Sequence, residues 1–287
     1  MNRRKFTIMR ILVVTFLLCG VLSVRSQNNE AQTIFLQGLE KYDAGKYAEA
    51  VQLYQRALVL VPNDANIYNN LGVAFTQSKQ YDEAIAALEK SIALKPQFAK
   101  AFYNLGIVYS LTGRDTKAVS VLQKAIILDP QYVKARTKLC EVYLATEQNK
   151  EAVGCYKELL PLAPKDDQSR SNYGFALMNI NRVKDAIIVL EETVRLFPPS
   201  AKTTINLGAA LFQSGRYNKA ISVYNRALEL EPDNNAARYN LAMAQLAVKD
   251  KTAALEQYAF LKNSNAELAQ RLFEIIYGDK IVAEKQR

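Results

Sequence analysis

Asparagine recurs at a single spacing along much of this chain. Five asparagines are separated from one another by 34 residues or a multiple of 34, namely Asn70, Asn104, Asn172, Asn206 and Asn240. A carboxamide has both donors and an acceptor, so it can pair with the N–H and C=O groups of a peptide whatever its side chains are. Each such contact contributes about 0.5–1.5 kcal/mol net, so several must act together. The row predicts a surface that holds an extended polypeptide by its backbone.

Basic and aromatic residues accompany this row. Lys138 stands in the same register as the asparagines, Lys134 precedes it by four residues, and Tyr103 and Tyr239 directly precede members of the row. A mixture of amide, aromatic and basic groups suits a peptide better than a sugar phosphate or a metal ion. The alternative is that the aromatic side chains pack within the fold and that the lysines are simply solvated.

The residues that would support catalysis are scarce. The sequence contains no histidine, which removes His-based triads, zincins and histidine acid–base chemistry. It also contains no Walker A or glycine-rich nucleotide loop. Carboxylate pairs such as Glu191-Glu192 are expected on helix surfaces, where charge is ordinarily solvated. We therefore predict that the chain is not an enzyme and that it needs no cofactor and no metal.

The spacing of the prolines shows which elements must position these residues. Six prolines follow one another at intervals of 34 residues: Pro62, Pro96, Pro130, Pro164, Pro198 and Pro232. When proline is placed at position 32 of each repeat, the chain divides into the ranges 31–64, 65–98, 99–132, 133–166, 167–200, 201–234 and 235–268. Self-similarity at such a period is typical of a repeat architecture.

Other positions of the repeat then align. Position 20 is always alanine: Ala50, Ala84, Ala118, Ala152, Ala186, Ala220 and Ala254. Position 8 is always small: Gly38, Gly72, Gly106, Cys140, Gly174, Gly208 and Ala242. Position 24 is always large: Tyr54, Leu88, Leu122, Tyr156, Leu190, Tyr224 and Tyr258. We expect the small residues to let two helices approach closely and the large ones to fill the space around them.

The pattern predicts one helical hairpin in each repeat. Positions 4, 7, 8 and 11 share one helix face, as do positions 20, 24 and 27 of a second helix. Turn-prone residues such as Ser214-Gly215-Arg216 lie between the two helices. The proline ends the second helix because it has no amide hydrogen and disfavours helix in the preceding residue. No hairpin buries both of its faces alone, so neighbouring repeats must stack.

This pattern resembles the tetratricopeptide repeat, with residues 201–234 (AKTTINLGAALFQSGRYNKAISVYNRALELEPDN) as its best copy. The resemblance implies an all-α fold, a right-handed α-solenoid of antiparallel helix hairpins with about seven repeats over residues 27–268. There are departures. The first repeat has Gln37 and Lys41 at usually apolar positions, Leu159 and Thr193 occupy the small position 27, and Ala266 replaces the last proline.

The end of such an array needs a cap, because the last repeat would otherwise expose an apolar face. Ser264-Asn265-Ala266-Glu267 has the sequence of a capping box. It is followed by a helical stripe of Leu268, Leu272, Ile275 and Ile276, and Gly278 is a plausible stop. We predict a capping helix over residues 264–277 and a loose tail over residues 278–287.

The resemblance also gives the asparagine row a place in the fold. In tetratricopeptide proteins the face that carries positions 2, 5, 6, 9 and 13 lines a concave groove, where partners bind as extended peptides or as folded elements. The row is similar to the asparagine ladder of O-linked N-acetylglucosamine transferases. The alternative is that Asn-Leu-Gly is a common string in this family. Asn104, Lys134 and Lys138 also match three positions of a clamp for a terminal carboxylate, but Asn69 and Val73 do not fit it.

The N-terminus resembles an export signal. Residues 1–10 are basic, residues 11–24 are mostly apolar, and cleavage after Ser26 is plausible. The alternative is an uncleaved anchor over residues 6–24, although the apolar run is short for a bilayer span.

The formal charge of +9 falls to +4 without residues 1–26 (32 basic and 28 acidic residues remain), which gives little support to nucleic-acid binding. Cys140 and Cys155 either pair or are two small packing residues.

Together these features predict an exported protein–protein scaffold that binds another protein or an extended peptide in its groove, in the periplasm or elsewhere outside the cytoplasm. The main alternative is a structural component of an envelope assembly, tethered to the membrane by an uncleaved leader. A weaker alternative is a subunit that recruits substrates to an enzyme, which rests on the asparagine row alone. The predicted groove residues are Asn70, Tyr103, Asn104, Lys134, Lys138, Asn172, Asn206, Tyr239 and Asn240.

Overall fold

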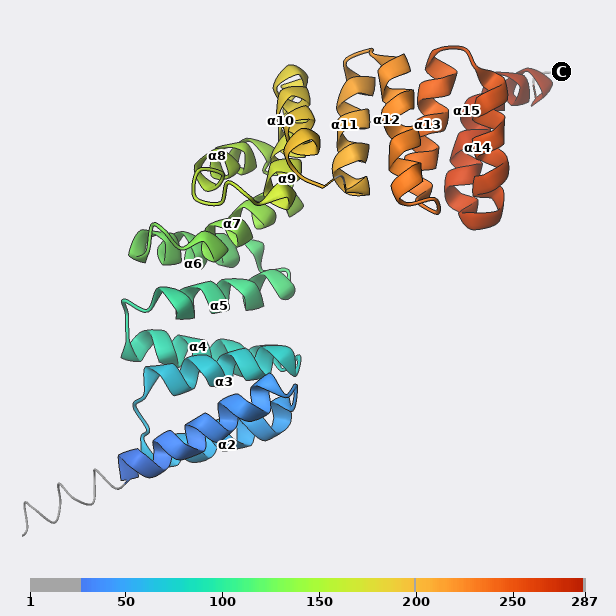
Figure 1. The fold of residues 1–287 in the computed structure, drawn as a ribbon. Helices are drawn as coiled ribbons and strands as arrows, with labels where there is room; N and C mark the ends of the chain where they lie inside the picture. Colours follow the sequence, from blue (N-terminus) through green and yellow to red (C-terminus); the bar gives the residue numbers. More distant parts are fainter. Residues whose placement is uncertain (1–26, 199, 286–287) are drawn as a thin grey trace, which may run out of the picture. The chain divides into compact units, whose positions relative to one another are not determined.

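The computed structural model describes residues 27–198 and 200–285 (Figure 1). The leader predicted at residues 1–26 lies outside the described residues. Within the described ranges all regular elements are helices, and no strand is present. This confirms the predicted all-α fold.

The chain divides into two compact units, an N-terminal unit (Met1–Val142) and a C-terminal unit (Tyr143–Arg287), and the boundary falls within one helix, α7. The N-terminal unit opens with a helix over residues 27–43. The helices that follow up to the boundary are α2 (Tyr47–Leu60), α3 (Ala65–Gln77), α4 (Tyr81–Leu94), α5 (Ala99–Leu111), α6 (Asp115–Leu128) and α7 (Val133–Ala145). Consecutive helices from α2 to α6 pack against each other, and α3 also contacts α5.

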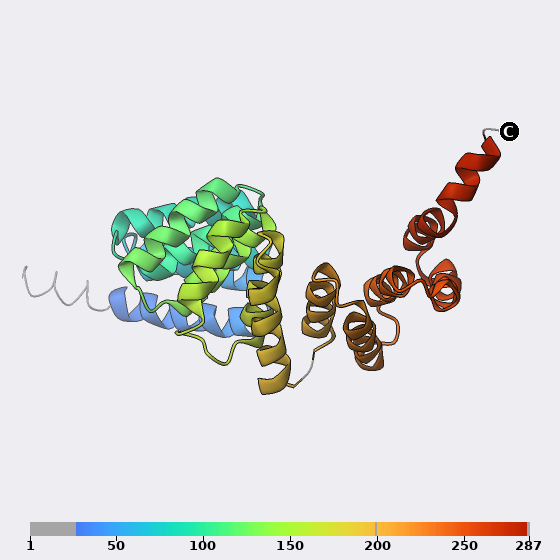
Figure 2. The ribbon, with the colours of Figure 1, turned by 90° about the horizontal axis from the view of Figure 1, so that it is seen from above.

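The C-terminal unit continues the alternation of two helices per repeat. Its helices are α8 (Asn149–Leu159), α9 (Asp167–Asn179), α10 (Val183–Leu196), α11 (Ala201–Gln213), α12 (Tyr217–Leu230), α13 (Asn235–Ala247), α14 (Lys251–Ser264) and α15 (Ala266–Lys285). Each packs against the next from α8 to α15, and α9 contacts α11, which contacts α13. Figure 2 views several of these helices nearly along their axes. The first helices of successive repeats therefore lie side by side and together form one face of the unit.

The small residue at position 8 makes room for the large residue at position 24 of the same repeat. A Cβ added to Gly208 would lie 2.5 Å from Cε1 of Tyr224, and one added to Gly106 would lie 2.6 Å from Cγ of Leu122. Tyr224 and Leu122 are almost fully buried. The predicted close approach is thus a contact between a helix backbone and a large side chain.

The alanines at position 20 fill the tightest places between the helices. All seven, from Ala50 to Ala254, have no exposed surface. Each lies on the second helix of its repeat, four residues before the large residue at position 24. Since a larger side chain has no space there, this invariance within the chain has a packing cause.

Arginine at position 4 of three repeats contacts the end of the preceding helix. Arg238 donates from Nη2 to the carbonyl oxygen of Pro232 at 2.7 Å, and Arg170 donates from Nε to that of Pro164 at 3.2 Å. Arg136 makes the equivalent contact with Pro130. A cation at a helix C-terminus compensates the negative end of the helix dipole. In these three repeats, the arginine therefore binds the carbonyl oxygen of the proline near the end of the preceding repeat.

The capping helix differs from its prediction at three points. Asn265, not Ser264, is its cap, because its Oδ1 accepts a hydrogen bond from the backbone N–H of Leu268 at 3.0 Å. Ile275 is 50% exposed and does not belong to the buried stripe. Gly278 does not end the helix, which runs to Lys285, because a glycine inside a helix costs only about 1 kcal/mol and does not by itself stop it. The predicted boundary at 277/278 was therefore wrong.

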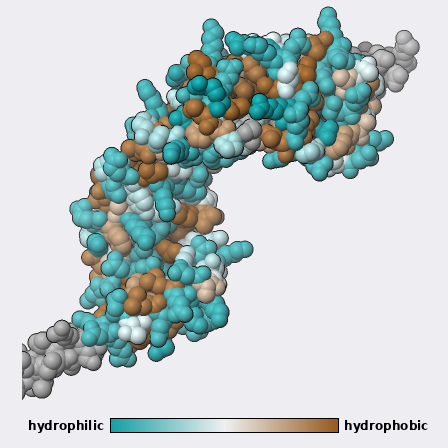
Figure 3. All heavy atoms as spheres, in the orientation of Figure 1, coloured by the Kyte–Doolittle hydropathy of each residue, from teal (hydrophilic) through white to brown (hydrophobic). Residues whose placement is uncertain are grey.

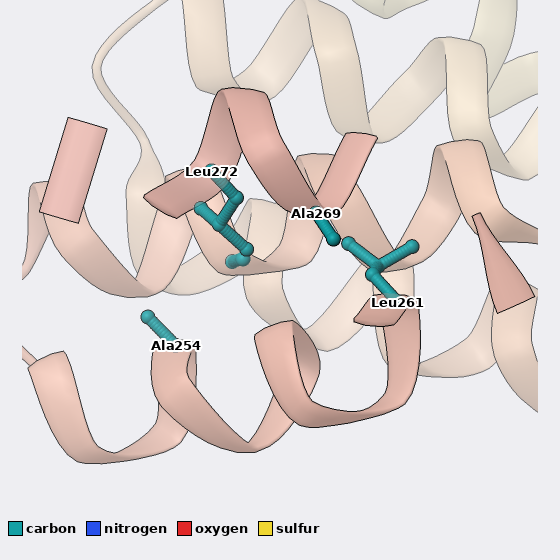
Figure 4. Packing of buried hydrophobic residues seen from close by; sticks show 5 residues of the cluster. Ala254, Leu261, Ala269 and Leu272 are labelled. Carbon is teal, nitrogen blue, oxygen red and sulfur yellow. The ribbon is translucent and has the colours of Figure 1, made fainter. Parts of the chain in front are cut away.

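The cap nevertheless closes the hydrophobic core of the last repeat. Ala254 and Leu261 of α14 pack with Ala269 and Leu272 of α15, as Figure 4 shows, and Ala242 of α13 completes the cluster. Leu268 and Ile276 pack against its border. The core of the last repeat is thus closed by a helix that buries Ala269 and Leu272.

Candidate partner-binding surface

The predicted groove residues all lie on the first helices of their repeats, and they fall into two separate sets. In the N-terminal unit, α3 carries Asn70, α5 carries Tyr103 and Asn104, and α7 carries Lys134 and Lys138. In the C-terminal unit they follow the same register: Asn172 on α9, Asn206 on α11, and Tyr239 and Asn240 on α13.

Two asparagines of the row bind the preceding repeat. Asn104 donates from Nδ2 to Oδ1 of Asn69 at 2.8 Å, and both side chains are buried. Asn206 donates from Nδ2 to Oγ of Ser171 at 3.0 Å. Both bonds join position 6 of one repeat to position 5 of the repeat before it. We call this contact the inter-repeat latch. Since the latch uses one of the two amide N–H groups, each of these asparagines keeps one N–H and the acceptor oxygen for a partner.

Asn172 lies in a small polar cluster that is open to solvent. Its Oδ1 accepts hydrogen bonds from Nε2 of Gln168 at 2.9 Å and from Nζ of Lys202 at 3.2 Å. Because these bonds use the acceptor oxygen, the amide N–H groups of Asn172 remain available for other contacts. Lys202 comes from the next repeat, so α9 and α11 supply this cluster jointly. Next to it, Phe175 is 39% exposed.

The remaining asparagines differ from these three. Asn70 is half-buried and donates from Nδ2 to the backbone carbonyl of Asn66 in its own helix at 2.8 Å. Asn240 is half-buried on α13. The row is therefore uniform in sequence but not in its contacts, which sequence spacing could not reveal.

Tyr103 lies against a second tyrosine in the N-terminal unit. Its ring centroid is 5.2 Å from that of Tyr132 at an angle of 53°. Burial raises the pKa of Tyr103, and the nearby Glu141 adds to the increase. Burial likewise raises the pKa of Tyr132 to about 12. Both phenols are therefore neutral at physiological pH, and each can donate a hydrogen bond.

The two predicted lysines differ in their surroundings. Lys134 is exposed, whereas Lys138 is half-buried with its Nζ 3.8 Å from Oε2 of Glu141. Glu141 thus partly neutralises the basic spot. Asn69, where a carboxylate clamp would need a lysine, is buried in the inter-repeat latch. This contact adds to the sequence evidence against such a clamp.

Tyr239 is a predicted groove residue that also contacts the last repeat and the capping helix. It packs against the core of the last repeat, and the guanidinium carbon of Arg271 lies 5.5 Å from its ring centroid. A cation over a tyrosine face is attracted by the ring's quadrupole. The capping helix thus contributes Arg271 beside a predicted groove residue.

Sequence reasoning missed several residues that complete this surface. Lys202, Gln168 and Ser171 contact the row directly. The sequence did contain a signal for these contacts. Position 2 is lysine in three repeats, and the residue before each asparagine lies on the same helix face as the row. Apolar side chains share the surface in the N-terminal unit, where Leu36 is 54% exposed. Figure 3 shows apolar and polar side chains interspersed over the visible face.

In the part of the chain that the structure describes, no helix has both the length and the apolar character needed to cross a membrane. Nor do three or more histidine, cysteine or carboxylate residues gather there in a way that could hold a metal ion.

Comparison with solved structures supports the fold. A tetratricopeptide repeat protein from Parabacteroides merdae ATCC 43184 superposes with a TM-score of 0.63 at 13% identity, over 86% of this chain and 99% of that one. YrrB, described as a TPR protein with an unusual peptide-binding site, gives 0.59 at 22% identity, over 64% and 95%. PilF of Pseudomonas aeruginosa gives 0.59 at 18%, over 72% and 95%. At these identities the likeness shows the fold alone.

Comparison with protein families gives the relationship directly. No curated protein sequence matches the chain significantly. A family model described as TPR repeat matches residues 38–78, 74–113 and 208–248, and one described as Tetratricopeptide repeat matches residues 112–171. These matches all lie within the predicted repeat array. The chain belongs to the tetratricopeptide repeat family.

Proposed function

We propose that this protein is an exported scaffold that binds an extended peptide, or an extended part of a protein, on the asparagine face of its repeats. The tetratricopeptide fold itself indicates a protein–protein interaction scaffold, and proteins of this kind are generally not catalytic. The observation that carries the finer proposal is the cluster around Asn172. Its amide N–H groups, the charge of Lys202 and the exposed ring of Phe175 lie together on adjacent helices.

This cluster offers what an extended peptide needs. The amide of Asn172 can donate to a backbone carbonyl, and Phe175 can cover an apolar side chain. Asn206 and Asn240 continue the same register along α11 and α13. A backbone bound at several repeats gains affinity from each, although each contact is weak. The surface therefore favours an extended segment over a small ligand.

The test is affinity capture from an envelope extract with residues 27–287 as bait. The variant carries Asn172→Ala and Asn240→Ala, which leave the inter-repeat latch intact. The matched control is Asn225→Ala, an exposed asparagine on α12, the second helix of its repeat. We expect a partner that is retained by the control and lost by the variant. A partner retained by both would place the interface on another face and contradict the proposal.

Two observations support export. The sequence of residues 1–26 resembles a signal peptide. Cys140 and Cys155 are both disulfide-bonded in the structure, and disulfides persist mainly in oxidising compartments. N-terminal sequencing of the protein from cells tests the proposal. A chain that begins near Gln27 supports a cleaved export signal, and an intact leader in the membrane fraction supports the tethered envelope component instead.

A further inference from the structure

Basic side chains gather at one edge of the C-terminal unit, away from the asparagine face. This edge consists of the turns between the two helices of the last three repeats, at residues 181–185, 215–219 and 249–253. The turns contain two acidic residues, Asp185 and Asp250. Their six basic residues are Arg182, Lys184, Arg216, Lys219, Lys249 and Lys251. We call these three turns the basic edge, and its formal charge is six minus two, or +4.

The three turns are neighbours in space and enclose open hollows. One hollow of about 480 Å³ is lined by residues of the first turn, including Arg182 and Lys184, and by Ser214. A second of about 300 Å³ is lined by residues of the middle turn, including Arg216 and Lys219, and by Val248. In Figure 1 the turns that join α11 to α12 and α13 to α14 lie at the same, upper end of these helices. The edge is therefore a continuous surface with recesses between its turns.

Few of these charges are neutralised within the protein. Arg182 donates from Nε to Oδ2 of Asp185 at 2.6 Å. Lys251 donates from Nζ to the carbonyl of Ile276 at 3.2 Å. For the other four basic residues, Lys184, Arg216, Lys219 and Lys249, the described part of the chain shows no ion pair, and all four are exposed.

The N-terminal unit shows that such a charge is not a requirement of the repeat. The equivalent turns at residues 45–49, 79–83 and 113–117 contain four basic and four acidic residues, so their formal charge is zero. Charges there also form ion pairs. Nη2 of Arg114 lies 3.3 Å from Oδ1 of Asp82 in the neighbouring turn, and Nζ of Lys46 lies 3.8 Å from Oε1 of Glu49. The same structural positions are thus neutral in the first three repeats and basic in the last three.

Unpaired like charges repel one another and raise the free energy of the isolated protein, and an anionic partner relieves this repulsion. We propose that the basic edge binds an acidic polypeptide segment, independently of the asparagine face. The open recesses admit carboxylate side chains, which the guanidinium of Arg216 and the ammonium of Lys219 can hold by charge-assisted hydrogen bonds. A membrane surface is less suited, because no large apolar side chain is among the exposed ones that the structure describes at this edge.

The experiment measures the anisotropy of a fluorescein-labelled oligoglutamate peptide titrated with residues 27–287. The edge variant carries Lys184→Glu, Arg216→Glu, Lys219→Glu and Lys249→Glu. The matched control reverses four charges at the equivalent turns of the N-terminal unit: Lys46→Glu, Lys79→Glu, Arg114→Glu and Lys117→Glu. Circular dichroism confirms that all variants are folded.

We expect the wild-type protein to bind the peptide with an affinity that falls as salt is added. The edge variant should bind about tenfold more weakly or worse, which corresponds to about 1.4 kcal/mol. The control should stay within about twofold of the wild type, because its turns carry no net charge. An equal loss in both variants would overturn the proposal, since the net charge of the whole protein would then explain the binding.

Three further arms test a different binding surface, different anionic partners and self-association. Asn172→Ala with Asn240→Ala should leave oligoglutamate binding unchanged, and a loss would instead place the acidic segment on the asparagine face. Vesicles containing phosphatidylglycerol, or single-stranded DNA, should compete more weakly than the peptide, and tighter binding by either would overturn the choice of partner. Sedimentation at low salt should show a monomer, whereas a dimer that the edge variant abolishes would assign the edge to a second copy of this chain.

Discussion

At the scale of single residues, identical side chains in the same register have different roles. Asn104 and Asn206 bind the preceding repeat, whereas Asn172 accepts from Lys202 and keeps its own N–H groups for another partner. Asn69 and Ser171, at position 5 of the preceding repeat, supply the acceptors for Asn104 and Asn206. A side chain's role in this protein therefore depends on the neighbouring repeat as much as on its own position.

Ala220 and Asn206 lie in the same repeat but should differ in their effect on stability. Ala220 is fully buried, so Ala220→Leu should overpack the helix pair and lower the free energy of unfolding by about 1–3 kcal/mol. Asn206→Ala removes one hydrogen bond to Ser171 and should cost about 1 kcal/mol. Urea denaturation of both variants measures the difference. A larger loss for Asn206→Ala than for Ala220→Leu would contradict the assignment of these two positions to surface and core.

Position 15 of each repeat has a positive φ. Three repeats have glycine there, and the other four have a different residue, of which Lys79 is one. Its φ of 60° is costly for an L-residue. Lys79→Gly should therefore raise the free energy of unfolding by about 0.5–1 kcal/mol, because relief of strain exceeds the added entropy of the unfolded chain. The control Lys90→Gly, exposed within α4, should lower it by about 1 kcal/mol. A destabilising Lys79→Gly would mean that this turn is not strained.

At the scale of helices, the period of the sequence was sufficient to predict most of the structure. Proline, alanine and glycine at fixed positions predicted the helix pairs and their packing, because these residues act on the backbone and on the closest contacts. The end of the array was less predictable. Beyond Asn265 no repeat constrains the pattern, so Gly278 looked like a stop and Ile275 looked like core. Both predictions failed, because the helix continues through Gly278 and Ile275 lies on its exposed side.

The capping helix gives a test at this scale. Leu272 is fully buried against α14, so Leu272→Ala should lower the free energy of unfolding by about 2–5 kcal/mol. Ile275→Ala, three residues later on the exposed side, should change it by less than about 0.5 kcal/mol. Thermal denaturation of the two variants checks the orientation of α15. A larger loss for Ile275→Ala would mean that the helix packs on its other face.

At the scale of the whole molecule, what the sequence could not predict concerns contacts between repeats. Spacing assigned Asn104 and Asn172 to the same surface, but it could not show that one is engaged by Asn69 and the other by Lys202, since these contacts join residues 30 or more positions apart. The charge of the basic edge was also hidden, because the net charge of the chain averages over both units. The choice of binding partner depends on such local differences in contacts and charge, which the repeat pattern of the family does not describe.

The tyrosines predict how the stability of the protein depends on pH. Burial raises the pKa of Tyr54 and of Tyr132 to about 12, and it also raises that of Tyr224. The folded state therefore favours the neutral phenols, whereas the unfolded chain ionises them near pH 10. Their contribution to stability is complete below pH 10 and is lost as the pH rises toward 12. Thermal denaturation from pH 8 to pH 11.5 should show a constant melting temperature followed by a steep decline.

The control for this pH dependence is Tyr54→Phe, which removes one ionisable group from the core and should make the decline shallower. A decline of unchanged steepness in that variant would mean that other groups determine the alkaline limit.

The inter-repeat latch has a consequence for how the repeats of this protein can evolve. Its donor and its acceptor are encoded 35 positions apart in different repeats, so neither repeat carries the whole interaction. Deleting or exchanging a single repeat would separate the donor of one repeat from the acceptor of the repeat before it. Although its repeats arose as copies, they are no longer interchangeable, and substitutions at positions 5 and 6 of adjacent repeats should be inherited as pairs.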